Sequence, residues 1–379
     1  MIRPKLLFFI TEDWVFCTHR LPLALAALEA GFDVTLVTNI STHAEVIKRA
    51  GIKLIPFNLE RGSMNPLKEL SVVARLTTIY RQEKPDVVHN VAIKPILYGS
   101  IAARLAGVTN IINALTGMGY LFTSDHPKTL LIRPFINFAL KVLLNGKNTR
   151  LIMQNQDDCT MLVNAGIVSS VSTKLIRGAG VDTKEFFYSL EPLSVPPRVV
   201  LPARMLKDKG VIEFVAATRI LKNRGVIANF VLVGDTDSHN HAALSVAQLA
   251  EWVTEGCVEW WDRRNDMPEV LANSHIVCLP SYREGLPKAL LEAASSGRPI
   301  VTTDTIGCRE VVRHGENGFL VPLRSTVELA DALQRLIENP ELRQKMGLRG
   351  REIAVQEFAV EKVVAETLAV YKELMTDRT

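Results

Sequence analysis

Two carboxylates at a fixed spacing, Glu284 and Glu292, are the most chemically informative residues of this chain. The apolar run 276–279 precedes them and is expected to form a buried strand, and a tight turn then leads into a short helix. Pro287 suits the first helical position, which needs no backbone donor, and Gly297 suits the stop after the helix. We therefore expect Glu284 just before this helix and Glu292 within it.

The start of this helix is a candidate anion-binding site. The first N–H groups of a helix have no partner inside it and lie at the positive end of the helix dipole. The turn is expected to direct the N–H groups of Gly285, Leu286 and Lys288 outward, toward a phosphate or diphosphate. An acid beside a bound anion is unfavourable unless it accepts hydrogen bonds from neutral hydroxyl groups. A sugar near one carboxylate and a ribose near the other would supply them.

Two cations, Arg204 and Lys209, follow the apolar run 199–202. Ligands of open α/β sheets bind beyond the carboxyl ends of the strands, so both cations are expected at the same edge as Glu284. A guanidinium and an ammonium hold phosphate in complementary ways, and with the helix dipole they would stabilise a leaving diphosphate. We predict no metal and no cofactor besides a nucleotide co-substrate. The His239-Asn-His241 pattern is a weak metal signal, and solvated surface charges are the alternative for the two cations.

The first half of the chain offers residues for a second substrate. His89 ends the fourth apolar run, where it could orient a reacting hydroxyl or contact a donor sugar, and a buried structural histidine is equally compatible. The glycine-containing loop after the fifth run permits close approach of the backbone to a ligand. The acceptor-binding candidates all follow apolar runs: His19, Lys94, Thr116, Gly117 and Gly119.

Three motifs, in this order, resemble the donor site of family 4 of the glycosyltransferases. They are Arg-x4-Lys-Gly from Arg204, Glu-x7-Glu from Glu284 with a following Gly-x-Pro-Ile-Val, and Gly-Glu-Asn-Gly-Phe-Leu-Val-Pro at 315–322. Members of this family are retaining enzymes of the GT-B fold that use nucleotide sugars. The resemblance implies that Arg204 and Lys209 hold the donor diphosphate. It also implies that Glu292 holds the ribose hydroxyls and Glu284 the transferred sugar.

Segments beginning at His19, Asn90 and Ala114 narrow this resemblance. They are similar to bacterial members that extend undecaprenyl-diphosphate-linked sugars, such as N-acetylgalactosaminyltransferases of lipid-linked oligosaccharide assembly. The chain departs from its relatives at 11–19, where many carry a glycine-rich loop, which argues against a close donor-phosphate contact from this half. It departs again at Asp262, where a glycine commonly ends the third strand of the second half.

Apolar runs alternate with periodic segments in both halves, which predicts an α/β fold with a doubly wound parallel sheet in each. The expected strands are 5–10, 34–38, 54–57, 87–89, 111–115 and 151–154, then 199–202, 230–233, 258–261, 276–279, 300–303 and 319–321. In agreement with the GT-B fold implied by the resemblance, we expect two Rossmann-like domains facing a cleft. The Pro- and Ser-rich stretch 189–198 separates them. Residues 1–190 would bind the acceptor and 197–358 the nucleotide sugar, with a helix at 360–375 crossing back to the first domain.

Composition describes a folded protein without a membrane span. The 379 residues are 47% hydrophobic and 22% charged, enough to bury two cores. Five scattered cysteines indicate reduced thiols, and the first apolar run is too short for a signal peptide. We expect a cytoplasmic protein, at most peripheral on the inner face of the membrane. The sequence has no basic patch with interleaved aromatic residues, so it does not suggest binding to nucleic acid.

Residues 126–156 contain no acid and five Lys or Arg residues, so the rest of this +4 chain carries a net charge of 4 − 5 = −1. Within this segment Arg133, Asn137, Lys141 and Asn145 recur every fourth residue on an otherwise apolar helix. One hypothesis places 126–150 at an anionic membrane surface, with Leu121 and Phe122 adjacent. The alternative is a helix buried against its sheet with its polar stripe toward solvent.

The predicted function is retaining, metal-independent transfer of a hexose or N-acetylhexosamine from a UDP-sugar to a hydroxyl of a lipid-linked glycan. Two carboxylates on opposite parts of the donor do not suit double displacement, so the leaving diphosphate is expected to take the acceptor proton. A nucleotide-sugar 2-epimerase and a non-catalytic binding protein are the alternatives. The chain lacks the dinucleotide-binding fingerprint of a dehydrogenase, because Phe122 stands where the third glycine of G-x-G-x-x-G would be in the loop that begins at Gly117. The sugar, the acceptor, the linkage and the oligomeric state stay open.

Overall fold

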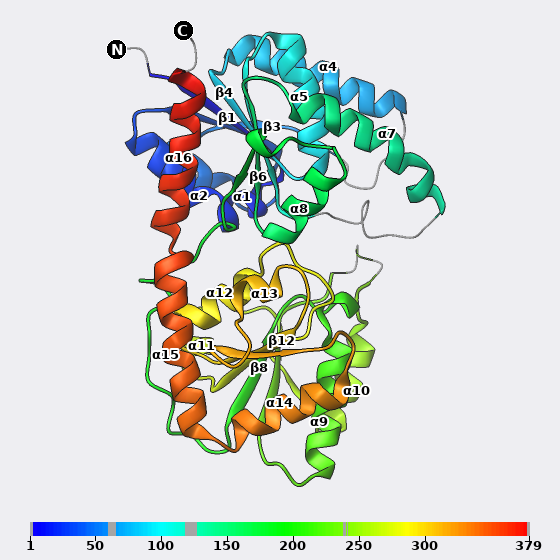
Figure 1. The fold of residues 1–379 in the computed structure, drawn as a ribbon, viewed down its shortest axis with the longest axis vertical. Coiled ribbons are helices and arrows are strands. Elements are labelled where there is room, and N and C mark those ends of the chain that lie inside the picture. The colour runs from blue at the N-terminus through cyan, green and yellow to red at the C-terminus, as the bar shows by residue number, and fades with distance from the viewer. Residues whose placement is uncertain (1–2, 60–65, 118–126, 238–239, 241, 377–379) are drawn as a thin grey trace. The chain divides into compact units, whose positions relative to one another are not determined.

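The computed structural model describes residues 3–59, 66–117, 127–237, 240 and 242–376, which form two units (Figure 1). Unit 1 comprises residues 1–179 and 362–379, and unit 2 comprises residues 180–361. Along the chain, unit 1 ends at Ala179 and unit 2 begins at Gly180, whereas the sequence suggested a boundary within 189–198. That stretch is attached to unit 2, because Arg298 donates to the carbonyls of Ser189 and Leu190.

Unit 1 contains a seven-stranded sheet in the order β3-β2-β1-β4-β5-β6-β7, with every neighbouring pair parallel. The six strands expected in this half are confirmed, with ends shifted by one or two residues. A seventh, β7, was not expected. The strands are β1 (Lys5–Glu12), β2 (Asp33–Asn39), β3 (Lys53–Pro56), β4 (Val87–Val91), β5 (Asn110–Leu115), β6 (Thr149–Met153) and β7 (Thr173–Leu175).

Alternation along the strands supplies two apolar faces in unit 1. In β1, Leu6 and Phe8 join one core with α1, α2 and α16, while Leu7 and Phe9 join another with α4 and α5. A third cluster lies between α5, α7 and α8 (Figure 1). The helices are α1 (Asp13–His19), α2 (Leu21–Glu29), α3 (Ala44–Arg49), α4 (Pro66–Glu83), α5 (Ile93–Ala106), α7 (Pro127–Leu144), α8 (Gln156–Asn164) and α16 (Val360–Thr376).

Unit 2 repeats the same topology with six parallel strands in the order β10-β9-β8-β11-β12-β13. All six expected strands are confirmed, and β11 and β12 have the predicted ends. The strands are β8 (Arg198–Pro202), β9 (Asn229–Val233), β10 (Glu259–Trp260), β11 (Ile276–Leu279), β12 (Ile300–Thr303) and β13 (Gly318–Val321).

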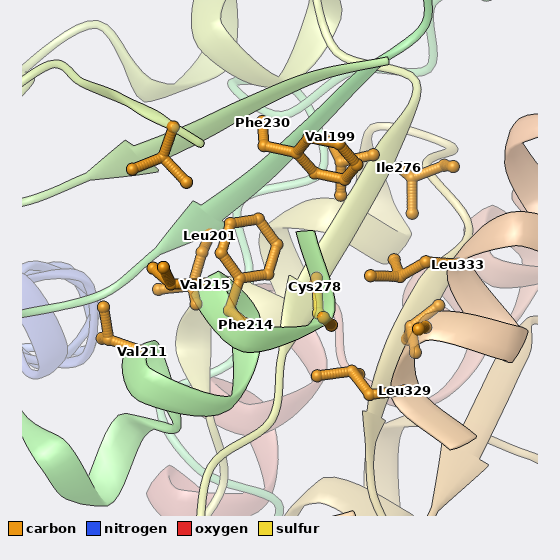
Figure 2. Close-up of a cluster of buried hydrophobic side chains, with 14 of the residues drawn as sticks. Val199, Leu201, Val211, Phe214, Val215, Phe230, Ile276, Cys278, Leu329 and Leu333 are labelled. Carbon is orange, nitrogen blue, oxygen red and sulfur yellow. The ribbon is translucent and has the colours of Figure 1, made fainter. Parts of the chain in front are cut away.

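Helices cover both faces of the second sheet. Figure 2 shows one face, where Leu201 and Cys278 from the strands pack against Phe214 of α9 and Leu329 of α14. On the other face, α11, α12, α13 and α15 close a separate apolar core. The helical elements are the 3-10 turn η2 (Lys207–Lys209), α9 (Val211–Asn223), α10 (Val246–Thr254), α11 (Met267–Ala272), α12 (Lys288–Ser295), α13 (Cys308–Val311), α14 (Thr326–Ile337) and α15 (Pro340–Glu357).

The C-terminal helix α16 packs on the first sheet for most of its length. Val363, Val370, Tyr371 and Leu374 are buried with the β1 core, and residues from Lys362 onward belong to unit 1. None of the described helices combines the length and the apolar composition needed to cross a bilayer.

Candidate functional site

The topology of unit 2 creates a ligand-binding position between β8 and β11. These strands are neighbours at the centre of the sheet, and the chain order reverses between them. The helix after β8, α9, covers one face, whereas the helix after β11, α12, covers the other. Such a switch point opens a crevice beyond the carboxyl ends of the strands, and open α/β sheets bind their ligands there.

Glu284 and Lys209 meet at this switch point. Lys209 ends η2 after β8, Glu284 lies between β11 and α12, and their side chains form an ion pair with 2.5 Å between Nζ and Oε1. The buried Ser281 hydroxyl donates to the same oxygen over 2.7 Å. Both charged side chains are only partly exposed, 21% for Lys209 and 13% for Glu284. The carboxylate is thus held in one position by a cation and a hydroxyl.

Two glycines allow the loop that carries Glu284 to approach its neighbours this closely. Gly210, at φ +72°, lies against Pro280, and a Cβ at this position would be 2.1 Å from the Pro280 carbonyl oxygen. On the other side Gly307, at φ +82°, would place a Cβ 2.5 Å from the Glu284 carbonyl oxygen. The Glu284 N–H donates to the Ile306 carbonyl over 3.1 Å. Glu284 is therefore positioned by its own loop and by the loops that carry Gly210 and Gly307. Gly307 was not identified from the sequence.

Arg204 is also paired in this structure. Its guanidinium binds the Asp237 carboxylate at 2.7 Å, with 49% of the arginine side chain and 27% of the aspartate side chain exposed. Asp237 was missed from the sequence, although it belongs to the polar segment that follows β9, the strand beside β8. Both cations of the predicted diphosphate clamp lie at the carboxyl edge of one sheet, and each has a carboxylate partner.

Helix α12 begins one residue later than expected. Pro287 is extended (φ −74°, ψ 110°) and precedes the first helical residue, Lys288, rather than occupying the first position. Its carbonyl accepts the N–H groups of Leu290 and Leu291, while the first N–H groups of the helix have no acceptor within it. The positive end of α12 begins four residues after Glu284 in the chain. The sequence predicted that the N–H groups of Gly285, Leu286 and Lys288 bind an anion there. Gly285 and Lys288 already interact with other residues of the protein.

Glu292 is a buried carboxyl one turn along this helix. Burial raises its pKa to about 7, the Lys288 ammonium at 3.4 Å opposes the rise, and the nearby Glu185 carboxylate adds to it. Only 13% of the side chain is exposed. Near neutral pH this group is therefore divided between its charged and neutral forms. The sequence did not predict that Glu185 lies near Glu292.

In unit 1, His89 is buried inside the fold. Its side chain is stacked on Phe8, and its Nδ1 is 2.6 Å from the Tyr371 hydroxyl of α16. Only 1% of the residue is exposed. Burial and the nearby Arg20 guanidinium hold the pKa of His89 well below its usual value, so the ring is neutral. These contacts favour the structural role over the catalytic one.

The acceptor-binding candidates are distributed over the carboxyl edge of the first sheet. Lys94 lies in the first turn of α5, after β4, and forms an ion pair with Glu69 at 3.3 Å. Thr116 and Gly117 directly follow β5, the strand beside β4. His19 is the last residue of α1. Gly119, Leu121 and Phe122 lie outside the described residues.

The turn before α5 contains an unusual backbone conformation. Ala92 has φ +81° and ψ 163°, a region that residues with a side chain rarely occupy. Its N–H donates to the Ala114 carbonyl of β5 over 3.0 Å, which fixes the turn against the neighbouring strand. Asp262 in unit 2 also has a positive φ of 48°, a conformation that glycine adopts without the cost that a side chain brings.

Among the described residues, no group of three His, Cys, Asp or Glu side chains is arranged to hold a metal ion. His239 and His241, the weak metal pattern of the sequence, lie outside those residues.

Comparisons with known proteins match both halves. A family model described as "Glycosyl transferase 4-like" matches residues 5–156, and one described as "Glycosyl transferases group 1" matches residues 196–339. The chain is similar to the Campylobacter jejuni N,N'-diacetylbacillosaminyl-diphospho-undecaprenol alpha-1,3-N-acetylgalactosaminyltransferase, with 27% identity covering 89% of this chain and 90% of that protein. It is also similar to the Escherichia coli UDP-Gal:alpha-D-GlcNAc-diphosphoundecaprenol alpha-1,3-galactosyltransferase, with 25% identity covering 82% and 81%.

Solved structures share the fold. A glycosyltransferase from Rickettsia africae superposes with a TM-score of 0.81 at 18% identity, covering 99% of both chains. Anabaena HepE in complex with UDP and glucose superposes with a TM-score of 0.76 at 21% identity, covering 97% of this chain and 100% of that one. The expected GT-B architecture is confirmed.

Proposed function

This chain belongs to the glycosyltransferases of the GT-B fold, and we propose that it transfers a hexose or N-acetylhexosamine from a UDP-sugar to a lipid-linked glycan. The observation that carries this proposal is the Lys209–Glu284 pair at the β8/β11 switch point, with Arg204 at the same edge of the sheet. It combines a phosphate-binding cation with a carboxylate that can accept sugar hydroxyls.

Each end of the donor has a matching group in unit 2. Arg204 and Lys209 bind the diphosphate, assisted by the positive end of α12. Glu292, one turn into the same helix, accepts hydrogen bonds from the ribose hydroxyls, and Glu284 accepts them from the transferred sugar. The UDP complex of the similar Anabaena HepE supports a uridine nucleotide as the donor.

The acceptor class is supported by the two curated relatives. Both are named as enzymes that act on undecaprenol diphosphate sugars, one adding N-acetylgalactosamine and the other galactose. Lys94, Thr116 and Gly117, at the carboxyl edge of the first sheet, are the residues proposed to meet this acceptor. The protein would work at the cytoplasmic face of the membrane that carries the lipid.

We further propose that the anomeric configuration is retained. Lys209 and Ser281 bind Glu284, and Glu292 lies within α12. With Glu284 assigned to the transferred sugar and Glu292 to the ribose, no opposed pair of carboxylates is available for double displacement. The acceptor hydroxyl then attacks on the face that the diphosphate leaves, and its proton passes to a diphosphate oxygen. The two cations and the α12 dipole stabilise the leaving group without a divalent ion.

Donor turnover tests this function. The purified protein is incubated with a panel of UDP-, GDP- and dTDP-sugars and a membrane extract, with and without EDTA. The expected result is EDTA-resistant release of one nucleotide that depends on the extract, with a product whose anomeric proton coupling matches that of the donor. Sugar release without an acceptor would indicate an epimerase instead. Binding of a ligand with no turnover of any donor would indicate a non-catalytic binding protein.

A further inference from the structure

Helix α7 carries two apolar faces, and only one of them is used inside the protein. On the inner face Leu140 and Leu144 are buried against β5, β6 and α8. This face joins α7 to the core of unit 1; Figure 1 shows the position of the helix in the fold. The sequence had suggested either a buried helix or a membrane-facing one, and the inner face alone would satisfy the first interpretation.

The outer face of α7 is a continuous row of exposed apolar side chains. Leu131 is 73% exposed, Phe135 74%, Phe138 70% and Val142 49%. Their spacing of four, three and four residues places them within about 60° of one another around the helix. Large apolar groups exposed singly are ordinary on a protein surface, but a row of four on one face marks a binding surface.

The charges around this outer row are positive. Lys141 and Lys147 are exposed beside its C-terminal end, and Arg104 of α5 reaches the same end, where it donates to the Val142 and Leu143 carbonyls. The sequence 126–156 contains no acid at all. Arg150 contributes less, because it forms an ion pair with Glu373 of α16.

We propose that the outer row of α7 (Leu131, Phe135, Phe138 and Val142) inserts into the interface of an anionic phospholipid membrane. The apolar side chains would enter the boundary between headgroups and acyl chains, while the cations contact lipid phosphates. The charge pattern favours this partner over a second copy of the chain, since antiparallel pairing of two α7 helices would bring like charges together. The proposal rests on the proposed function for its purpose, which is to hold the protein where a lipid-linked acceptor resides.

Vesicle flotation of the full chain tests this surface. The vesicles contain either phosphatidylcholine alone or equal parts of phosphatidylcholine and phosphatidylglycerol. We expect the protein to float with the anionic vesicles, to be released by high salt, and to bind phosphatidylcholine vesicles weakly. The double change Phe135→Ser and Phe138→Ser should weaken partitioning at least about tenfold, because two large apolar side chains no longer leave water.

A matched pair of single changes distinguishes the outer row from general surface hydrophobicity. Leu131→Ser should weaken binding, whereas Leu70→Ser, at a 66% exposed leucine of α4, should leave it unchanged. Equal effects of the two changes, or full binding by the double variant, would overturn the proposal. A wild-type dimer that the double change converts to a monomer would assign the row to an interface between copies instead.

Activity on a short-chain, water-soluble acceptor separates this proposal from the proposed function. The double variant should retain turnover with such an acceptor and lose it with acceptor embedded in anionic vesicles. Turnover on both acceptors at the wild-type rate would remove the membrane role and leave the transferase intact.

Discussion

Replacing Glu292 with glutamine should increase the stability of unit 2 at neutral and alkaline pH while impairing donor binding. Burial raises the pKa of Glu292 from its ordinary 4.5 to about 7. A carboxyl whose pKa is higher in the folded state stabilises the fold only while it is protonated. Its contribution is complete below pH 4.5 and is lost as the pH rises through about 7. Glutamine keeps the shape of the side chain and never acquires the charge.

The size of the effect follows from the pKa shift. With pKa values of 4.5 unfolded and about 7 folded, the stabilising contribution falls by about 2 kcal/mol between roughly pH 5.5 and pH 8. The difference in the free energy of unfolding between Glu292→Gln and wild type should therefore grow by about 2 kcal/mol over this range. Because this is a difference between two proteins, other titrating groups cancel.

Urea unfolding followed by tryptophan fluorescence measures this difference, since Trp252, Trp260 and Trp261 all lie in unit 2. A Glu→Gln change at the exposed Glu338 serves as the control for loss of a charge. In the transfer reaction, wild-type kcat/KM for the donor should fall as the pH decreases below about 7, and the variant should lack this dependence. A stability difference that stays constant with pH, or a variant less stable than wild type at pH 8, would refute the reasoning.

Three further predictions concern the same two sheets. Lys209→Ala and Glu284→Ala should each reduce transfer at least about 100-fold with little change in unfolding, because each removes a group that acts on the donor; near wild-type product formation by either would contradict its role. Gly307→Ala and Gly315→Ala change glycines of similar φ, +82° and +81°, but a Cβ meets the Glu284 carbonyl oxygen only at 307. Both variants should lose about 1–2 kcal/mol of stability. Gly307→Ala alone should lose more stability and should also transfer sugar more slowly. Equal transfer activities of the two variants would show that the Glu284 loop tolerates displacement. Ala92→Gly should raise the unfolding free energy by about 1 kcal/mol, because glycine relieves the φ of +81°, and thermal denaturation showing a less stable variant would refute the strain.

The sequence predicted the sheets well because their signal is local. Buried parallel strands are apolar runs, and the runs at β11 and β12 give the observed ends. The edge strand β7 (Thr173–Leu175) escaped notice because it is short and only partly buried, so it has no such run. The expected helix start at Pro287 differed by one residue, since a proline satisfies both the first helical position and the position before it.

The site was predictable to the level of which strand ends carry it. Arg204, Lys209 and Glu284 follow β8 and β11, and the rule that ligands bind at carboxyl ends brings them together. Their actual partners depend on tertiary geometry. Asp237 is 33 residues from Arg204, and the Tyr371 hydroxyl that engages His89 is 282 residues away in sequence. No local pattern reports such contacts, which is why the sequence left two roles open for His89.

For the donor site proposed above, the ion pairs Lys209–Glu284 and Arg204–Asp237 have a consequence for selectivity and for the order of events. An arriving anion competes with a carboxylate for each cation instead of entering an unoccupied positive pocket. Free phosphate gains too little from such an exchange to compete in a cell, whereas a nucleotide sugar adds contacts through its ribose and its sugar. The Glu284 oxygen that Lys209 holds would become more available to sugar hydroxyls once the diphosphate has taken this lysine. The phosphate and sugar ends of the donor would therefore bind cooperatively, and a fragment with only one of them would leave a charge without its partner.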